Sequence, residues 1–299
     1  MAAEILDGKQ IARTIQKEIR RDVKRLVAET GVTPQLTVLL VGDDPASHSY
    51  VRAKTRTCRR VGIRDDTRVL PESISEEALL DLIDELNRDR EVHGILVQMP
   101  LPGHISSQRV IEALDFRKDV DGFHPTNVGL MSIGSPYMEP CTPRGIVEIL
   151  NRTGHTPAGK HVVIVGRSNI VGKPLMNMLV QKTPEANATV TVCHTGTPDI
   201  ATHTRRGDIV VVAAGRPEIV TGEMLRDGCV VIDVGVNRVP DPNAEKGYRL
   251  VGDVAFASAK EVAAAITPVP GGVGPMTVTL LVRNTLRAAR AQLGLDPDG

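Results

Sequence analysis

The segment that most constrains the fold is residues 161–174, His-Val-Val-Ile-Val-Gly-Arg-Ser-Asn-Ile-Val-Gly-Lys-Pro. A run of β-branched residues ends at Gly166, and a second glycine follows at Gly172. This pattern is typical of a buried parallel strand that turns directly into a helix whose N-terminus faces a phosphate. The usual dinucleotide fingerprint has three glycines, whereas here Ser168 and Val171 replace the second and third. The segment predicts a dinucleotide-binding turn, and a strand–turn–helix without a ligand stays open as the alternative.

The next predicted strand, residues 188–194, indicates which dinucleotide such a turn would accept. In an NAD site an acidic residue usually ends this strand and binds the ribose hydroxyls, but here the strand ends at His194 and Thr195 follows. Without a carboxylate, nothing at this position repels a 2′-phosphate. Arg167, in the glycine turn, is a suitable charge-assisted donor to that phosphate. The residues therefore favour NADP as the cofactor, with NAD still possible, and a solvated Arg167 is the alternative.

Composition excludes several classes of protein. The 299 residues are enough for two domains, and 36 Lys and Arg against 36 Asp and Glu leave no net field to attract nucleic acid or an anionic membrane. Aromatic residues make up only 2%, too few for stacking on single-stranded nucleic acid. No apolar run approaches the roughly 18 residues of a membrane span. The four cysteines form no C-x-x-C pair, which predicts reduced cytoplasmic thiols and no metal site.

Helical and strand patterns alternate along the chain, which predicts an α/β fold with mainly parallel sheets. Residues 115–145 are rich in loop-forming residues, so the domain boundary is expected near Pro143. The N-terminal α/β catalytic domain would span 1–143, completed by a C-terminal helix over 276–299, and a Rossmann-like domain would span 144–275, with a cleft between them. Helices are expected at 11–31, 46–61, 75–86, 145–152 and 278–293, and strands at 36–41, 93–97, 162–165, 189–193, 208–213 and 229–234.

A candidate catalytic pair lies on the second predicted helix. Tyr50 and Lys54 are four residues apart and therefore share one helix face. Like charges favour a neutral amine and so lower a lysine pKa, as a general base near neutral pH requires. Four arginines crowd the same segment and are the expected source of such a shift: Arg52, Arg56, Arg59 and Arg60. A solvated basic face is the alternative interpretation.

Three further segments carry candidate site residues. Gln98 ends a buried strand, where α/β sites collect, and is expected either to hydrogen-bond Lys54 or only to cap the strand. Asp119 and Asp121 lie in a rigid polar loop, where a lone carboxylate suits the N–H edge of a 2-amino heterocycle, and turn bonding is equally compatible. The Pro- and Gly-rich residues 267–277 are stiff and allow close approach of a flat ligand, with an interdomain hinge as the alternative.

Taken in order, five segments resemble the bifunctional methylenetetrahydrofolate dehydrogenase/methenyltetrahydrofolate cyclohydrolase family over nearly the whole chain. They are Tyr50-Val51-Arg52-Ala53-Lys54, Val97-Gln98-Met99-Pro100-Leu101-Pro102, Lys118-Asp119-Val120-Asp121-Gly122-Phe123, Gly166 to Pro174, and Pro270-Gly271-Gly272-Val273-Gly274-Pro275-Met276-Thr277. The opening Ile5-Leu6-Asp7-Gly8-Lys9 also matches the family's start, so no transit peptide is expected.

The resemblance implies a role for each matched position. Tyr50 would stack on the folate, Lys54 would be the central catalytic group tuned by Gln98, and Asp121 would hold the pterin edge. The cofactor would contact Gly166, Arg167 and Ser168 through its phosphates, Thr195 near its 2′-phosphate and Val236 near its nicotinamide. One wall of the substrate site would consist of Pro270, Gly271, Gly272, Val273 and Gly274. Thr195 stands where relatives often carry serine, which leaves NADP exclusivity open.

The implied reaction oxidises 5,10-methylenetetrahydrofolate with NADP⁺ and hydrolyses the methenyl product to 10-formyltetrahydrofolate. The resemblance also implies a cytoplasmic homodimer that serves one-carbon metabolism and purine biosynthesis. Two rival interpretations are a two-domain dehydrogenase of a small acid, which would lack a pterin for Asp121 to bind, and a non-catalytic NADP sensor, which would tolerate loss of Lys54.

Overall fold

The computed structural model describes residues 3–42, 45–244 and 247–299. The chain divides into two compact units, which we name by their sheets. The six-stranded unit comprises residues 1–12 and 142–277, and the three-stranded unit comprises residues 13–141 and 278–299.

The three-stranded unit is built on a parallel sheet in the order β3-β2-β4. Its strands are β2 (Gln35–Val41), β3 (Arg64–Leu70) and β4 (Gly94–Val97). Its helices are α1 (Gly8–Thr30), α2 (Pro45–Val61), α3 (Glu76–Arg88), α4 (Ser107–Ala113), α5 (Pro125–Ser132) and α10 (Gly274–Gln292), of which α1 and α10 begin in the other unit.

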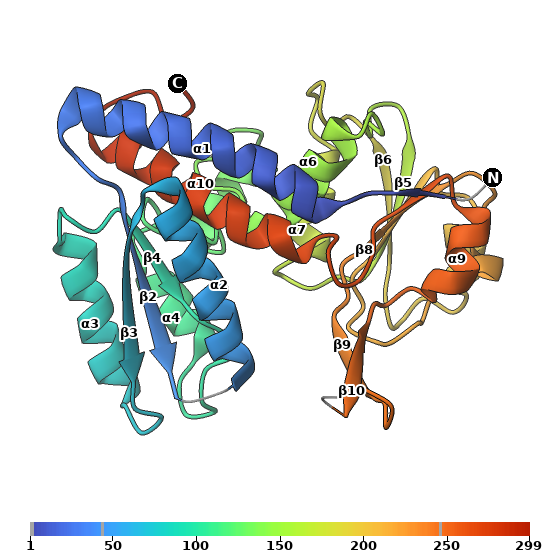
Figure 1. Ribbon diagram of the computed structural model, residues 1–299, viewed down its shortest axis with the longest axis horizontal. Coiled ribbons are helices and arrows are strands. Elements are labelled where there is room, and N and C mark those ends of the chain that lie inside the picture. The colour runs from blue at the N-terminus through green and yellow to red at the C-terminus, as the bar shows by residue number, and fades with distance from the viewer. Residues whose placement is uncertain (1–2, 43–44, 245–246) are drawn as a thin grey trace. The chain divides into compact units, whose positions relative to one another are not determined.

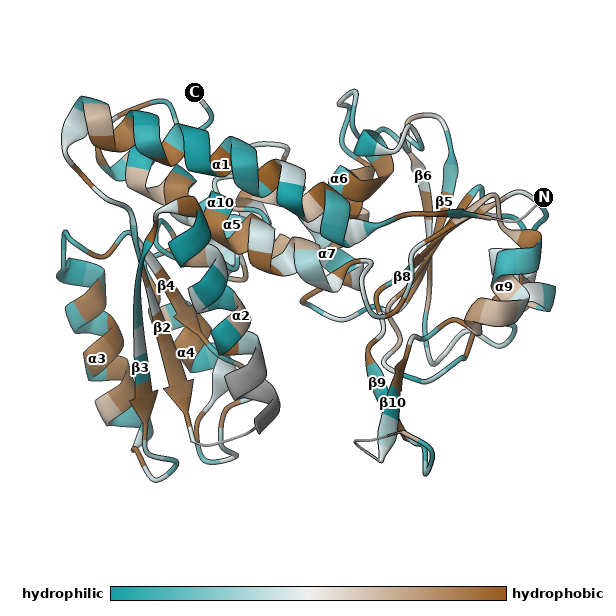
Figure 2. Ribbon diagram, viewed as in Figure 1, coloured by the Kyte–Doolittle hydropathy of each residue, from teal (hydrophilic) through white to brown (hydrophobic). Residues whose placement is uncertain are grey.

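A hydrophobic core joins β2 and β4 to α3 and α4. Leu39, Ile95 and Ile83 are among its fully buried members, and Figure 2 shows β2 and β4 as predominantly hydrophobic strands. Helix α3 starts where the sequence predicted, because the Ser75 hydroxyl accepts a hydrogen bond from the backbone N–H of Ala78. Such an N-cap stabilises a helix by about 1 kcal/mol.

Helices α1 and α10 run side by side in the three-stranded unit (Figure 1). A buried hydrogen bond from Gln16 Nε2 to Thr279 Oγ1, 2.8 Å long, ties them together. The Gln16 amide oxygen in turn accepts a hydrogen bond from Arg60 of α2. The last helix of the chain is therefore an integral part of this unit.

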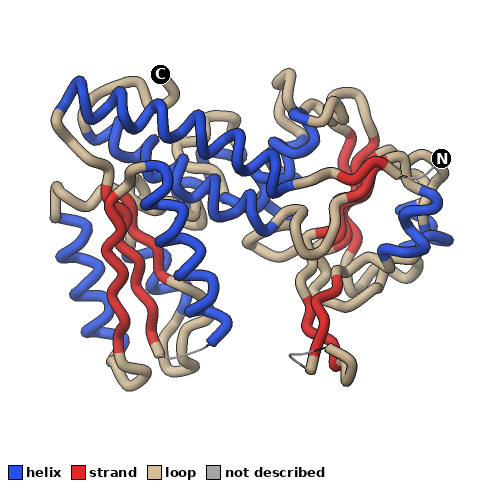
Figure 3. Tube along the Cα trace, viewed as in Figure 1, coloured by secondary structure: helices blue, strands red, loops and turns tan. Residues whose placement is uncertain are grey.

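The six-stranded unit contains a wholly parallel sheet in the order β1-β11-β8-β7-β5-β6. Figure 3 draws the strands of the protein in red. Its strands are β1 (Glu4–Ile5), β11 (Ala265–Ile266), β8 (Val230–Asp233), β7 (Ile209–Val212), β5 (His161–Val165) and β6 (Thr189–Cys193). An antiparallel hairpin, β9 (Asn237–Pro240) and β10 (Tyr248–Val251), extends from it. Its helical segments are α6 (Cys141–Arg152), α7 (Gly172–Leu179), α8 (Ile200–Thr204), η1 (Gly222–Met224) and α9 (Phe256–Val262).

The predicted two-domain α/β architecture is present, but several elements were not predicted, among them β1 and α5. Residues 1–12 were expected in the N-terminal domain, yet β1 pairs with β11, and the Leu6 N–H donates to Ile266 O at 2.9 Å. The loop-rich stretch 115–145 contains α5, whose start is capped by the His124 ring nitrogen. A two-residue strand and a helix of eight residues are too short to give a clear periodic pattern in the sequence.

No helix in the part of the chain that the structure describes combines the length and apolar character needed to cross a membrane. All four cysteines are free and buried.

Candidate functional site

Lys54 lies on α2 of the three-stranded unit and is only 3% exposed. Its Nζ donates a hydrogen bond to Gln98 Oε1 at 2.9 Å and stands 4.6 Å from the centroid of the Tyr50 ring. The hydrogen bond expected between Lys54 and Gln98 is therefore present. Gln98 is itself fixed, because its Nε2 donates to Met99 O at 2.7 Å and its backbone N–H donates to Leu39 O at 2.8 Å. The end of β4 thus orients the amide that holds the amine.

The pKa of the Lys54 amine is lowered from its ordinary value, as the sequence predicted, but for a different reason. Burial is the main cause, and the neighbouring Asp121, Cys141 and Cys58 oppose it. The arginine explanation is wrong, because all four arginines of the segment are exposed on α2 while the lysine is buried. Desolvation disfavours a charged amine, so burial makes it easier for Lys54 to exist as the neutral amine that can accept a proton.

The two carboxylates of the Asp119-Val120-Asp121 segment have different surroundings. Asp119 is buried and accepts hydrogen bonds from the backbone N–H groups of Gly122 and His124 and from the Asn127 amide. This is the turn bonding that the sequence left open, and it makes Asp119 a structural residue. Asp121 keeps part of its surface exposed, and it is the carboxylate that acts electrostatically on Lys54.

Burial raises the pKa of Asp121 to about 6. The positive Lys54 opposes the rise, Asp119 adds to it, and a hydrogen bond from Cys141 lowers the pKa slightly. Burial also raises the pKa of the Cys141 thiol well above its usual value, so this cysteine stays protonated. The three-stranded unit therefore brings together an amine with a lowered pKa, a carboxyl that ionises near neutral pH, and a neutral thiol.

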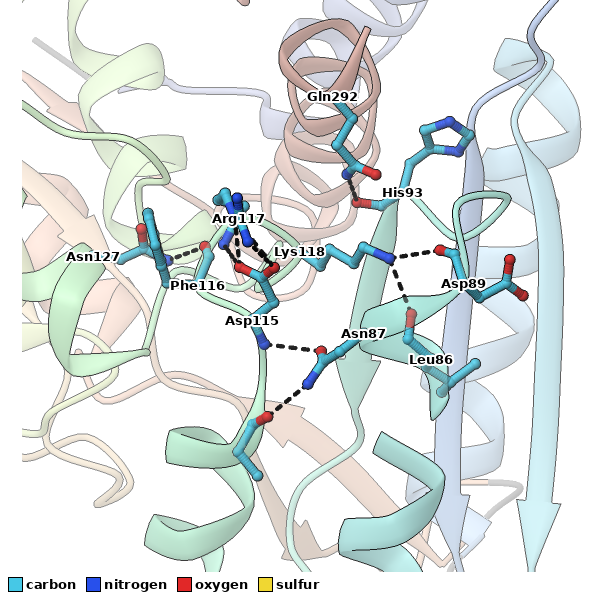
Figure 4. Close-up of polar contacts among 11 residues, drawn as sticks. Leu86, Asn87, Asp89, His93, Asp115, Phe116, Arg117, Lys118, Asn127 and Gln292 are labelled. Carbon is cyan, nitrogen blue, oxygen red and sulfur yellow. Dashed lines mark hydrogen bonds and ion pairs between the residues drawn. The ribbon is translucent and has the colours of Figure 1, made fainter. Parts of the chain in front are cut away.

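Polar contacts hold the loop that carries Asp121 against α3 (Figure 4). The buried Lys118 Nζ donates to the backbone oxygens of Leu86 and Asp89, at 3.0 and 2.6 Å, where α3 ends. The Asn87 side chain donates to Ala113 O and accepts from the Asp115 N–H. These contacts cap the carbonyl end of the helix and fix the start of the loop.

Helix α10 fixes the same loop from the other end of the sequence. The buried Asn284 amide donates to Val120 O at 2.8 Å and to Glu139 O at 2.9 Å. Gly122 packs directly on this second segment, since a Cβ there would lie 2.8 Å from the Glu139 carbonyl carbon and the Pro140 nitrogen. Sequence reasoning missed Asn284 and the proximity of Cys141 to Asp121, because contacts over such separations leave no local pattern.

In the six-stranded unit, the glycine turn after β5 is as tight as the sequence predicted. A Cβ on Gly166 would lie 2.2 Å from Ala213 O, and a Cβ on Gly172 would lie 2.1 Å from Gly166 O. Gly166 also has a φ of +132°, a conformation that side chains rarely adopt. Helix α7 begins at Gly172, directly after this turn. This strand–turn–helix geometry suits a phosphate group.

The other predicted cofactor residues lie at the same edge of the six-stranded sheet. Arg167, Ser168 and Thr195 are exposed and follow the neighbouring parallel strands β5 and β6. The Ser168 hydroxyl accepts a hydrogen bond from the Val171 N–H at 3.1 Å, which keeps its own O–H proton for donation. Val236, after β8, is an apolar side chain with 62% of its surface exposed. These residues fit a dinucleotide, with charged and polar groups at one end and an apolar contact at the other.

Residues 267–274 are packed on the start of α1 within the same unit. The Lys9 N–H donates to Gly271 O at 3.1 Å, and a Cβ on Gly8 would lie 1.8 Å from Gly272 O. Gly271, Gly272 and Val273 are buried, whereas Pro270 and Gly274 are exposed. The structure thus leaves Pro270 and Gly274 as the accessible members of the predicted substrate wall.

Within the described ranges, no group of three or more His, Cys, Asp or Glu side chains is placed to hold a metal ion.

Comparison with known proteins matches both units to the same protein family. The family model "Tetrahydrofolate dehydrogenase/cyclohydrolase, catalytic domain" matches residues 6–121, and the family's NAD(P)-binding domain model matches residues 140–293. The chain is 54% identical to the bifunctional protein FolD of Syntrophobacter fumaroxidans over 290 residues, which is 97% of this chain and 98% of that protein.

Two solved structures have the same fold over nearly their whole length. The FolD enzyme of Campylobacter jejuni superposes with a TM-score of 0.90 at 42% identity, covering 97% of this chain and 99% of that one. The FolD enzyme of Trypanosoma brucei, complexed with NADP cofactor and an inhibitor, gives a TM-score of 0.92 at 41% identity, covering 98% and 99%.

Proposed function

The chain belongs to the tetrahydrofolate dehydrogenase/cyclohydrolase family, and we propose that it oxidises 5,10-methylenetetrahydrofolate with NADP⁺ and hydrolyses the product to 10-formyltetrahydrofolate. The observation that carries this proposal is the buried Lys54, hydrogen-bonded to Gln98 and placed over Tyr50. A buried amine with a lowered pKa, held by a fixed amide, is a group that can exchange protons with a substrate.

In the first reaction, hydride leaves the one-carbon bridge of the folate, and NADP⁺ supplies the nicotinamide that accepts it. The Tyr50 ring gives the folate a flat face to pack on. Asp121 accepts hydrogen bonds from the 2-amino and ring N–H groups of the pterin. Lys54 fixes the position of the bridge by hydrogen bonding, and Gln98 prevents the amine from turning away.

In the second reaction, water attacks the cationic bridge carbon and gives up a proton to the neutral Lys54 amine. The bond between the bridge carbon and N5 then breaks, N5 takes a proton, and the bridge oxygen becomes the formyl carbonyl. One proton is released overall. The lowered pKa of Lys54 keeps a fraction of the amine unprotonated for this step.

Two assays test the proposal. The wild-type protein should form NADPH from NADP⁺ and 5,10-methylenetetrahydrofolate, and it should also hydrolyse preformed methenyltetrahydrofolate without any nucleotide. A dehydrogenase of small acids would lack both folate-dependent changes. A non-catalytic NADP sensor would bind NADP⁺ and show neither activity.

Arg167→Ala is predicted to reduce kcat/KM with NADP⁺ about 10–100-fold and to change kcat/KM with NAD⁺ little. Arg167 is exposed in the turn after β5, and the residues that follow the neighbouring strand β6, His194 and Thr195, bring no carboxylate to repel a 2′-phosphate. Loss of a charge-assisted hydrogen bond costs about 1.5–3 kcal/mol, and only NADP⁺ carries the 2′-phosphate. Steady-state kinetics with both nucleotides measure the effect. Proportional losses with both would show that Arg167 contacts the common pyrophosphate.

Gly166→Ala is predicted to weaken NADP⁺ binding by about tenfold and to lower the melting temperature. The added Cβ would meet Ala213 O, and alanine would be strained at a φ of +132°. Such backbone strain costs about 1–3 kcal/mol, which displaces the turn from its phosphate-binding position. Calorimetry and thermal unfolding measure the two effects. Gly103→Ala is the matched control, because no atom lies within 4 Å of a Cβ at that residue.

The homodimer, the cytoplasmic location and the supply of formyl groups for purine biosynthesis are further predictions. They rest on the family resemblance. Sedimentation equilibrium of the purified protein tests the dimer.

A further inference from the structure

Asp253 is a fully buried carboxylate in the six-stranded unit, placed just after β10. Its Oδ2 accepts hydrogen bonds from two consecutive backbone groups, the Ala214 N–H at 2.7 Å and the Gly215 N–H at 2.8 Å. Its Oδ1 accepts a hydrogen bond from Asn237 Nδ2 at 2.8 Å. Burying a carboxyl is costly unless several donors satisfy it, and these three do so.

The partners of Asp253 come from two neighbouring strands. Ala214 and Gly215 follow the carboxyl end of β7, and Asn237 begins β9, four residues beyond Asp233, the last residue of β8. The contact is direct, because a Cβ on Gly235 would lie 2.2 Å from Asp253 Oδ1. Asp253 therefore links the two segments that leave adjacent strands at the carboxyl edge of the sheet.

The backbone around Asp253 is held by a second buried carboxylate. Asp233 Oδ1 accepts hydrogen bonds from the N–H groups of Gly235 and Asp253, at 3.0 and 2.9 Å. Its Oδ2 accepts one from the Val254 N–H at 3.0 Å. The exposed Val236 is thus fixed on both sides, through Gly235 bound to Asp233 and through Asn237 bound to Asp253.

These segments continue into the glycine turn, because Gly166 packs against Ala213 O. The ends of β8, β7 and β5 consequently form one connected edge, with Val236 at one end and the phosphate-binding turn at the other. In parallel α/β sheets a dinucleotide lies along this edge. A shift of the Ala214–Gly215 segment or of Val236 would displace the nicotinamide half of the cofactor.

We propose that Asp253 is a positioning residue for the nicotinamide half of the cofactor site, acting through Ala214, Gly215 and Val236. The inference rests on the proposed function in one respect, namely that NADP⁺ binds at this edge. It concerns hydride transfer and leaves the Lys54 group of the three-stranded unit untouched. Asp253 therefore distinguishes the two reactions of the protein.

The experiment compares Asp253→Asn with Asp208→Asn in the full chain. Asparagine keeps the shape but places an amide N–H₂ group against one of the donors that the carboxylate satisfies. Asp208 is the matched control, since it also accepts a backbone N–H, that of His161 at 2.8 Å, but lies before β7, at the opposite edge of the same sheet. Both variants are assayed for NADP⁺-dependent oxidation and for nucleotide-free hydrolysis of methenyltetrahydrofolate.

Asp253→Asn is expected to lower dehydrogenase kcat/KM for NADP⁺ by about tenfold or more, while hydrolysis stays within about twofold of wild type. Asp208→Asn should leave both activities near wild type. An Asp253→Asn protein with unchanged dehydrogenase kinetics overturns the proposal. So does a parallel fall of both activities together with the melting temperature, because that result describes a residue needed only for folding.

If the Asp253→Asn protein does not fold, Asn237→Ala tests the positioning role of Asp253 instead. It removes one donor and leaves the carboxylate bound to both backbone N–H groups, so a smaller loss confined to the dehydrogenase reaction is expected, and no loss overturns the proposal. Wild-type protein without either activity would refute the proposed function itself, which separates the two failures.

Discussion

Lys54→Met is expected to reduce the rate of methenyltetrahydrofolate hydrolysis by about 10²–10⁴-fold, the usual contribution of a general acid–base group. Methionine has a similar length and no proton to exchange, so the attacking water would have to lose its proton to solvent. The Gln98 amide oxygen would lose its donor as well. Rates of hydrolysis of preformed methenyltetrahydrofolate, measured under single-turnover conditions, give the effect on chemistry alone.

The Lys54→Met protein should remain folded and should bind NADP⁺ as wild type does. Replacing a buried ionisable group with an apolar one of similar volume is often neutral for stability, and the proposed nucleotide residues lie in the other unit. Arg56→Met, on the exposed side of α2, is the matched control and should keep full activity. Lys54→Arg should be nearly as inactive as Lys54→Met, because a guanidinium keeps its proton. Hydrolysis at the wild-type rate in Lys54→Met would show that another group handles the proton.

The sequence predicted the parts of this site that depend on local rules. A helix places Tyr50 and Lys54 on one face, and the end of a parallel strand places Gln98 at the edge where sites form, so their meeting followed from the fold class. The glycine turn after β5 could be predicted in the same way, because the close contact of Gly166 with Ala213 leaves no room for a side chain and so requires glycine.

The sequence could not supply what depends on burial and on distant contacts. Lys54 and the four arginines share one basic segment, and only the packed structure shows that the lysine is inside and the arginines are outside. The same limit explains why β1 was assigned to the wrong side of the boundary, since its partner β11 lies at the far end of the chain. Asn284 likewise binds backbone oxygens 164 and 145 residues away, and the two backbone donors to Asp253 lie 39 and 38 residues away.

Asp121 is the carboxyl whose proposed role in folate binding conflicts with stability. The protein around it raises its pKa from 3.8 to about 6, which means that folding favours the protonated form. In the native state the carboxyl therefore binds its proton more tightly than in the unfolded state. Its contribution to stability is neutral at low pH and becomes unfavourable as the pH rises through about 4 to 6. A protein selected only for stability would have no use for a carboxylate here.

Asp121→Asn is accordingly predicted to weaken folate binding about 10–100-fold while stabilising the protein at neutral pH. The carboxylate can accept two hydrogen bonds from the pterin edge, each worth about 1.5–3 kcal/mol, whereas the amide presents one acceptor and one mismatched donor. A pKa difference between 3.8 and about 6 corresponds to about 3 kcal/mol. Lys54 loses a favourable neighbour in the variant, which offsets part of this gain, so a net stabilisation of about 1–2 kcal/mol is expected.

Urea unfolding at several pH values measures the effect of Asp121→Asn on the free energy of unfolding. Calorimetry measures its effect on the affinities for folate and for NADP⁺. The gain in the free energy of unfolding should be largest above about pH 7 and should vanish as the pH falls through 6 toward 4, because the wild-type carboxyl then becomes protonated. A variant less stable than wild type at neutral pH would mean that Lys54 and Cys141 stabilise the carboxylate more than burial penalises it. Equal weakening of folate and NADP⁺ binding would instead assign Asp121 to the support of its loop. Loss of folate affinity alone, together with increased stability, is the result that places the pterin against this carboxylate.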